Sequence, residues 1–129
     1  MLPSDKQLLD ECDEFCRLEI IKELVEIKGA DVNIRDERTG KTPLMLASTS
    51  SENIEEVKYL IEKGAEVNAK DNKGLMTLDY AYFSGKNKEE LVDYLKSVGA
   101  KTKDGYDIVD GMVVTKKSLK ELFEMALLS

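Results

Sequence analysis

A short phrase occurs three times in this chain at a spacing of 35 residues. It reads Gly29-Ala30-Asp31-Val32-Asn33, then Gly64-Ala65-Glu66-Val67-Asn68, and then the more divergent Gly99-Ala100-Lys101-Thr102-Lys103. An internal period of this length is typical of stacked supersecondary units, each of which contacts mainly its neighbours. The repeat therefore predicts an elongated stack with one continuous core, before any single residue is considered.

An amphipathic helix is expected before each of these glycines. Apolar residues recur at helical spacing in the positions four, five and about eight residues before the glycine. These are Val25, Leu60 and Leu95; Leu24, Tyr59 and Tyr94; and Ile21, Val57, Leu91 and Val92. Glycine suits the left-handed conformation that ends helices, where a side chain costs about 1 kcal/mol or more. Each unit is thus predicted to close with a helix and a glycine stop.

Helix start signals keep the same register. Asn53 to Glu56 and Asn87 to Glu90 each match a capping box, 34 residues apart. Thr42-Pro43 opens a shorter helix, with threonine as N-cap and proline in the first turn, and its counterpart begins near Met76. A further capping box at Ser4 to Gln7 predicts that the first helix begins at about Asp5.

The chain at this point resembles the ankyrin-repeat family. The second unit, from Asp36 to Asn68, carries Gly40-x-Thr42-Pro43-Leu44-x-Leu46-Ala47 and then Val57 to Asn68 in the order of the family signature. The resemblance covers about residues 5 to 104. It implies an all-α solenoid of paired antiparallel helices in a single domain over residues 1–129. The expected parts are an N-terminal capping repeat at 4–35, a central repeat at 36–70, a third repeat at 71–104, and a C-terminal segment at 105–129.

The departures from the family pattern are also informative. Met45 and Asp79 stand where the Thr-Pro-Leu-His motif has histidine, so a hydrogen-bonding group that ties adjacent loops is missing. Extra residues enter the loop at 34–39 and the turns at 48–52 and 85–88, which are expected to protrude. The first repeat lacks a glycine turn, and its helices are expected to separate near Arg17.

The last 25 residues do not repeat. Residues 106–109 and 112–115 flank Asp110-Gly111, which predicts a two-residue β-hairpin with a type I′ turn. Ser118 to Glu121 then caps a helix running to about Leu128, with its apolar residues on one face. Two roles remain open for this segment: a cap folded on the third repeat, or a surface that pairs with a second copy.

Composition narrows the classes of function. The net charge of −7 repels a phosphate backbone, which argues against nucleic-acid binding, and a basic protein partner is easier to accommodate. The sequence shows neither a secretory leader nor a stretch long and apolar enough to span a membrane, and we expect a cytoplasmic protein. Cys12 and Cys16, four residues apart, are expected to be buried reduced thiols.

The sequence offers little chemistry for catalysis. It contains no histidine, the residue that most often performs acid–base work at neutral pH, and no phosphate-binding glycine loop. Two cysteines without histidine do not make a structural zinc site. We therefore expect no enzyme activity, no cofactor and no bound metal.

The resemblance also implies where a protein partner binds. Ankyrin-like stacks bind through their projecting loops and the inner face of their short helices, which form a concave surface. Carried over to this sequence, the partner-binding residues are Arg35, Arg38, Lys41, Thr49, Lys70, Asn72, Lys73, Leu75 and Phe83. The leading hypothesis is a monomeric protein-binding module, with an inhibitor or immunity-type neutraliser as its specific form. The alternative is a structural component that forms homodimers through the C-terminal hairpin and helix.

Overall fold

The computed structural model describes residues 2–50, 54–83, 88–103, 105, 107–109 and 112–114. Within these ranges the regular secondary structure of the repeats is helical, and loops join the helices. They are α1 (Pro3–Glu14), α2 (Leu18–Lys22) continuing as the π-helix η1 (Glu23–Ile27), α3 (Pro43–Ser50), α4 (Glu55–Glu62), α5 (Thr77–Phe83) and α6 (Lys88–Ser97).

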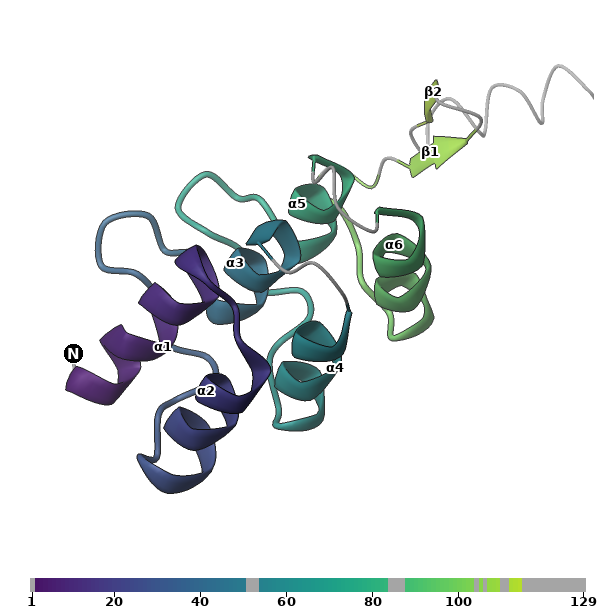
Figure 1. The fold of residues 1–129 in the computed structure, drawn as a ribbon. Coiled ribbons are helices and arrows are strands. Elements are labelled where there is room, and N and C mark those ends of the chain that lie inside the picture. The colour runs from purple at the N-terminus through teal and green to yellow at the C-terminus, as the bar shows by residue number, and fades with distance from the viewer. Residues whose placement is uncertain are drawn as a thin grey trace, which may run out of the picture.

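The helices form three pairs that stack side by side in two layers (Figure 1). The first layer contains α1, α3 and α5, and the second contains α2 with η1, α4 and α6. Helix α1 packs on α3, α3 packs on α5, and α2 contacts α4. The predicted all-α repeat solenoid is confirmed. We refer to the pairs as the first, second and third units.

Leucines and other apolar residues at equivalent positions build one continuous core between the layers. Leu60 and Val57 in α4, Ile21 in α2 and Leu95 in α6 are completely buried. Leu44 and Ala47 are the corresponding buried residues of α3. Because each unit buries its apolar face against the next, the stack and not the single unit is the folding element.

The repeat glycines end the second helices as expected. Gly64 and Gly99 have φ values of 96° and 90°, and the following N–H groups of Ala65 and Ala100 reach back to the carbonyls of Leu60 and Leu95, each at 2.9 Å. This backward bond to the residue five positions earlier satisfies a carbonyl that the helix itself leaves free.

In the first unit the helix contains one extra residue before its glycine. The prediction that Val25 corresponds to Leu60 and Leu95 was therefore wrong. Ala30 bonds to Leu24, six positions back, because η1 widens the helix by one residue. Leu24 is therefore buried at the place of Leu60 and Leu95, whereas Val25, which we had aligned with them, is only partly buried.

Two helix starts can be compared with their predicted caps. Thr42 caps α3, since its Oγ1 accepts a hydrogen bond from the N–H of Met45 at 3.3 Å. The predicted start at Asp5 was wrong: α1 begins at Pro3, whose fixed φ suits a first turn. The Asp5 carboxylate instead accepts the N–H of Asp31 at 2.8 Å. Asn53 and Asn87, the other two predicted caps, lie outside the described residues.

The chain turns between α1 and α2 without a glycine, near the predicted break at Arg17. Cys16 takes the left-handed conformation there, with φ of 50°. Glu11 is buried and anchors the turn. It accepts hydrogen bonds from the backbone N–H of Arg17 at 2.9 Å and from its guanidinium at 2.8 and 2.9 Å. The Arg17 hydrogen bond lowers the pKa of the Glu11 carboxyl below its ordinary value.

Both cysteines are buried free thiols, as predicted. They lie at the end of α1 and in the turn that follows it. A hydrogen bond with Cys16 and burial raise the pKa of the Cys12 thiol well above its ordinary value. A thiol held protonated in this way is a poor nucleophile, so Cys12 serves as an apolar core residue.

Asparagine side chains connect successive units. The Asn33 side chain accepts the N–H of Glu66 at 2.8 Å and donates to the carbonyl of Gly64 at 3.0 Å. Asn68 makes the same pair of bonds to Lys101 and Gly99, at 2.8 and 3.0 Å. One amide group thus holds both an acceptor and a donor of the next unit, which fixes the register between units.

Two short strands follow the repeats. Asp107–Val109 (β1) pairs antiparallel with Met112–Val114 (β2), with Ile108 opposite Val113. They lie where the sequence predicts a hairpin, but residues 110–111 and the helix predicted from Ser118 to Leu128 lie outside the described residues. The type I′ turn, the capping role and the homodimer therefore stay predictions.

Replacing Leu60 with alanine is expected to lower the free energy of unfolding by about 2–5 kcal/mol, because the side chain is completely buried in the central unit. Urea unfolding followed by circular dichroism measures this loss. Leu2→Ala is the control, since Leu2 is 64% exposed and its truncation is expected to cost less than about 0.5 kcal/mol. Equal effects of the two substitutions would contradict the assigned core.

The asparagine links can be tested one at a time by amide hydrogen exchange. Asn68→Ala should accelerate exchange of the Lys101 amide and leave that of Glu66 unchanged, because Lys101 loses its acceptor. Asn33→Ala should have the reverse effect. We expect each substitution to cost about 1 kcal/mol of stability. Unchanged exchange at both amides would show that the links do not hold the register.

Candidate functional site

Two loops project in front of α3 and α5, and aspartates shape both of them. In the first loop Asp36 Oδ1 accepts the N–H groups of Arg38 at 2.8 Å and Thr39 at 3.0 Å, and the Asp36 N–H donates to the Lys41 carbonyl at 2.9 Å. The bonds from Thr39 and Arg38 lower the pKa of the Asp36 carboxyl. The ionised carboxylate thus holds the loop closed at neutral pH.

The second loop repeats this design with Asp71. Its Oδ1 accepts the N–H groups of Lys73 at 2.8 Å and Leu75 at 2.9 Å, and the Asp71 N–H donates to the Leu75 carbonyl at 2.9 Å. Asp71 is buried, unlike the half-exposed Asp36. These hydrogen bonds fix the conformation of the loop, so its side chains are positioned before any ligand binds.

The two loops are bonded to each other. Asn72 donates from its backbone N–H to the carbonyl of Thr39 and from Nδ2 to the carbonyl of Arg38, each at 3.0 Å. The Arg35 guanidinium donates to the carbonyl of Lys70. A Cβ on Gly40 would come within 2.5 Å of Asn72 Oδ1, so this close approach requires glycine, which also has φ of +74°. The loops therefore form one continuous rim.

Tyr80 and Asp71 form a polar cluster that the sequence analysis missed. The Tyr80 hydroxyl donates to Asp71 Oδ2, and the ammonium of Lys41 lies 5.3 Å from the centre of the Tyr80 ring. The available signal was that Tyr80 occupies the position of Leu46 in the preceding unit.

The cluster has a defined protonation state. Burial alone would raise the pKa of the Asp71 carboxyl, but hydrogen bonds from the Tyr80 hydroxyl and from the N–H groups of Leu75 and Lys73 lower it below its ordinary value. Burial and the hydrogen bond to Asp71 raise the pKa of Tyr80 well above its ordinary value. At neutral pH a charged carboxylate therefore accepts from a neutral tyrosine.

Asp79 replaces the missing histidine of the third unit. Its side chain is 1% exposed, and Oδ2 accepts the N–H groups of Met76 and Lys103, each at 2.9 Å. The first bond caps α5 and the second ties the segment after α6 to that helix. Asp79 Oδ1 has no hydrogen-bond partner among the described residues. The Asp79 carboxylate thus makes hydrogen bonds between neighbouring segments, a role for which the sequence contains no histidine.

The predicted partner-binding residues fall into two groups. Seven lie on the bonded loops: Arg35, Arg38, Lys41, Lys70, Asn72, Lys73 and Leu75. Thr49 and Phe83 lie at the other ends of α3 and α5, roughly 10 Å away at 1.5 Å per residue. Lys41 and Leu75 are half-buried, and the others are exposed.

Phe83 is the most conspicuous of these residues. Its side chain is 72% exposed. Thr49 in the equivalent position donates from Oγ1 to the Leu46 carbonyl at 2.9 Å. We name the nine predicted residues the recognition face.

Other kinds of site were sought in the described part of the chain. There, no group of three or more Cys, Asp or Glu side chains is placed to hold a metal ion. None of the helices described has the length and apolar character that crossing a membrane requires.

Comparison with known proteins gives a consistent family result. The family model described as ankyrin repeats, in three copies, matches residues 11–105. Alpha-latrocrustotoxin-Lt1a of Latrodectus tredecimguttatus is 43% identical over 81 residues, which are 63% of this chain and 5% of the toxin. Ankyrin repeat and SOCS box protein 6 of Homo sapiens is 37% identical over 91 residues, 64% of this chain and 22% of that protein.

A third relative is named as a potassium channel. Potassium channel AKT1 of Arabidopsis thaliana is 44% identical over 68 residues, 53% of this chain and 8% of the channel. The chain thus spans a quarter or less of each of these three relatives. The three relatives are larger proteins with different names.

The Asp71 cluster gives a pH-dependent prediction. Tyr80→Phe removes a hydrogen bond to the carboxylate, so the pKa of Asp71 should rise and stability at pH 7 should fall by about 1 kcal/mol. Because the folded-state pKa is lowered, the stability difference is present above the ordinary value of 3.8 and disappears as the pH falls through the folded-state pKa.

Carbon-13 NMR titration of the Asp71 carboxyl and urea unfolding at pH 7 and pH 3 measure the two effects. Tyr94→Phe is the matched control, because the Tyr94 ring in α6 of the third unit lies beside a different lysine, Lys58 of α4. An unchanged Asp71 titration in Tyr80→Phe would contradict the cluster.

Proposed function

Because this chain belongs to the ankyrin-repeat family, we propose that it binds one protein partner through its recognition face. Ankyrin repeats are in general protein–protein interaction modules. The proposal extends this general role to a surface of this chain, the two projecting loops and the exposed ends of α3 and α5.

The observation that supports it is the bonding between the two loops. Asn72 joins them through the carbonyls of Arg38 and Thr39, and Asp36 and Asp71 fix each loop internally. A surface held in this way loses little conformational entropy when a partner binds, so more of the contact energy appears as affinity.

The side chains on the face suit a protein partner. Phe83 offers a large exposed apolar group, and Arg38 offers an exposed guanidinium. Aromatic and arginine residues are enriched among those that dominate binding energy at protein interfaces. We expect these two residues to contribute most.

We further propose a non-catalytic mechanism of occlusion, in which the bound module covers a functional surface of its partner. An inhibitor or neutraliser of the immunity type is the specific form. A cytoplasmic location accords with two buried thiols that remain free.

The experiment is affinity capture from the native source with quantitative mass spectrometry. Phe83→Ala combined with Arg38→Ala should leave the thermal midpoint nearly unchanged, because both side chains are exposed, and should reduce capture of the partner at least about tenfold. Val98→Ala with Lys101→Ala, exposed positions outside the recognition face, is the matched control. Equal capture by the two double variants would refute the assigned face.

A further inference from the structure

Among the described residues, the first unit has a helical neighbour on one side only (Figure 1). On α1, Leu8 and Cys12 are buried in the core, whereas Gln7, Asp10 and Glu14 form a separate stripe at helical spacing. This stripe and the α2–η1 helix enclose a groove of about 350 Å³, which we name the end groove. Its nine lining residues come from these elements, from Phe15 after α1 and from Lys28 after η1.

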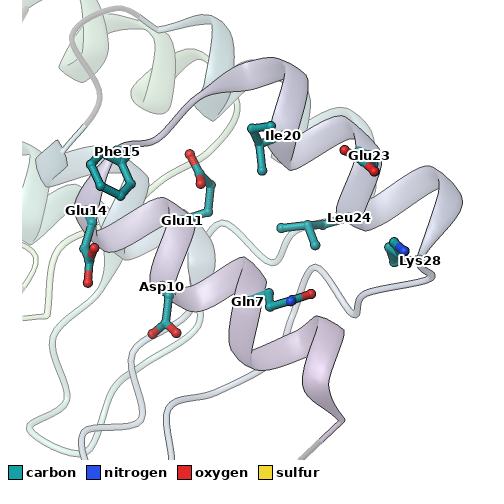
Figure 2. A pocket seen from close by; sticks show the side chains of 9 residues that line it. All are labelled: Gln7, Asp10, Glu11, Glu14, Phe15, Ile20, Glu23, Leu24 and Lys28. Atoms are coloured by element: carbon teal, nitrogen blue, oxygen red, sulfur yellow. The ribbon is translucent and has the colours of Figure 1, made fainter.

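The floor of the end groove is apolar. Figure 2 shows Ile20 and Leu24 projecting from α2 and η1 toward α1, with the Phe15 ring at one end of the groove. Phe15 is 65% exposed, and the Arg17 guanidinium lies 4.8 Å from its ring centre. An exposed aromatic ring beside other apolar side chains leaves area that a partner can bury.

The rim of the end groove is acidic. Asp10 and Glu14 project from α1 and Glu23 from η1, and all three are exposed. A fourth carboxylate, Glu11, is already neutralised by Arg17 at 2.8 Å. Lys28 is the one cationic residue among those that line the groove. Three carboxylates around an apolar floor are complementary to a ligand that is basic at its edges and apolar in its centre.

We propose that the end groove binds an amphipathic helix of a partner protein, with a stripe of large apolar residues flanked by Lys or Arg. Two helices with an apolar floor between them offer the geometry that accepts a helix in a groove. The surface lies on α1, α2 and η1, whereas the recognition face belongs to the second and third units, so the two sites are separate.

The test uses an 18-residue helical peptide of leucine and lysine, labelled for fluorescence polarisation, at physiological salt. A second peptide carries glutamate in place of every lysine. The protein is expected to bind the lysine peptide and to bind the glutamate peptide at least about tenfold more weakly. Equal binding of both peptides would overturn the proposal.

Matched variants separate the groove from the general negative charge of the protein. Asp10→Asn, Glu14→Gln and Glu23→Gln together should weaken the lysine peptide about tenfold. Glu62→Gln, Glu66→Gln and Asp93→Asn remove the same charge from exposed positions elsewhere and should leave binding within about twofold. Phe15→Ala should also weaken binding, since it removes part of the apolar floor.

Equal weakening by the two triple variants would overturn the proposal, because the peptide would then respond only to net charge. Sedimentation of the protein alone gives a further check. A dimer that dissociates in the groove variant but not in the control would show that a second copy occupies the groove, and would also overturn it.

Discussion

The structure depends on a repeated amide bridge between units. Asn33 and Asn68 each accept an N–H and donate to a carbonyl of the following unit, and Asp5 accepts an N–H from the loop that follows the first unit. An asparagine amide satisfies both groups only when the units stand in one register. The bridges therefore decide which residues face one another across the stack, and the apolar core supplies most of the energy that keeps the units together.

Three local departures from an ideal repeat are compensated locally. The π-helix η1 absorbs an extra residue and brings Leu24 to the core, and Cys16 makes a left-handed turn that Glu11 and Arg17 anchor. In the third unit, Asp79 binds two backbone N–H groups. A stack of nearest-neighbour contacts tolerates such changes because a distortion in one unit is not passed to the others.

The fold was largely predictable, because a 35-residue period with a glycine stop leaves few architectures. Features set by contacts between units were not. The capping box predicted at Ser4 to Gln7 was wrong, because α1 begins at Pro3 without a side-chain cap, and the Asp5 carboxylate accepts a hydrogen bond from the distant Asp31 N–H. The positions of the recognition face were taken from the resemblance to the ankyrin-repeat family, and most of those on the loops are exposed. Tyr80 and Asp71 were missed because their hydrogen bond joins residues nine apart, which no helical or strand pattern indicates.

The bonds between the two projecting loops have a consequence for affinity. A displacement of the Arg38 backbone alters its hydrogen bond to Asn72, and the second loop connects Asn72 to Asp71 and Tyr80. Substitutions on separate loops should therefore not act independently. When one residue on each of the two projecting loops is substituted, the changes in binding free energy should deviate from additivity. The changes caused by substituting Arg38 and Phe83, which lies at the far end of α5, should sum.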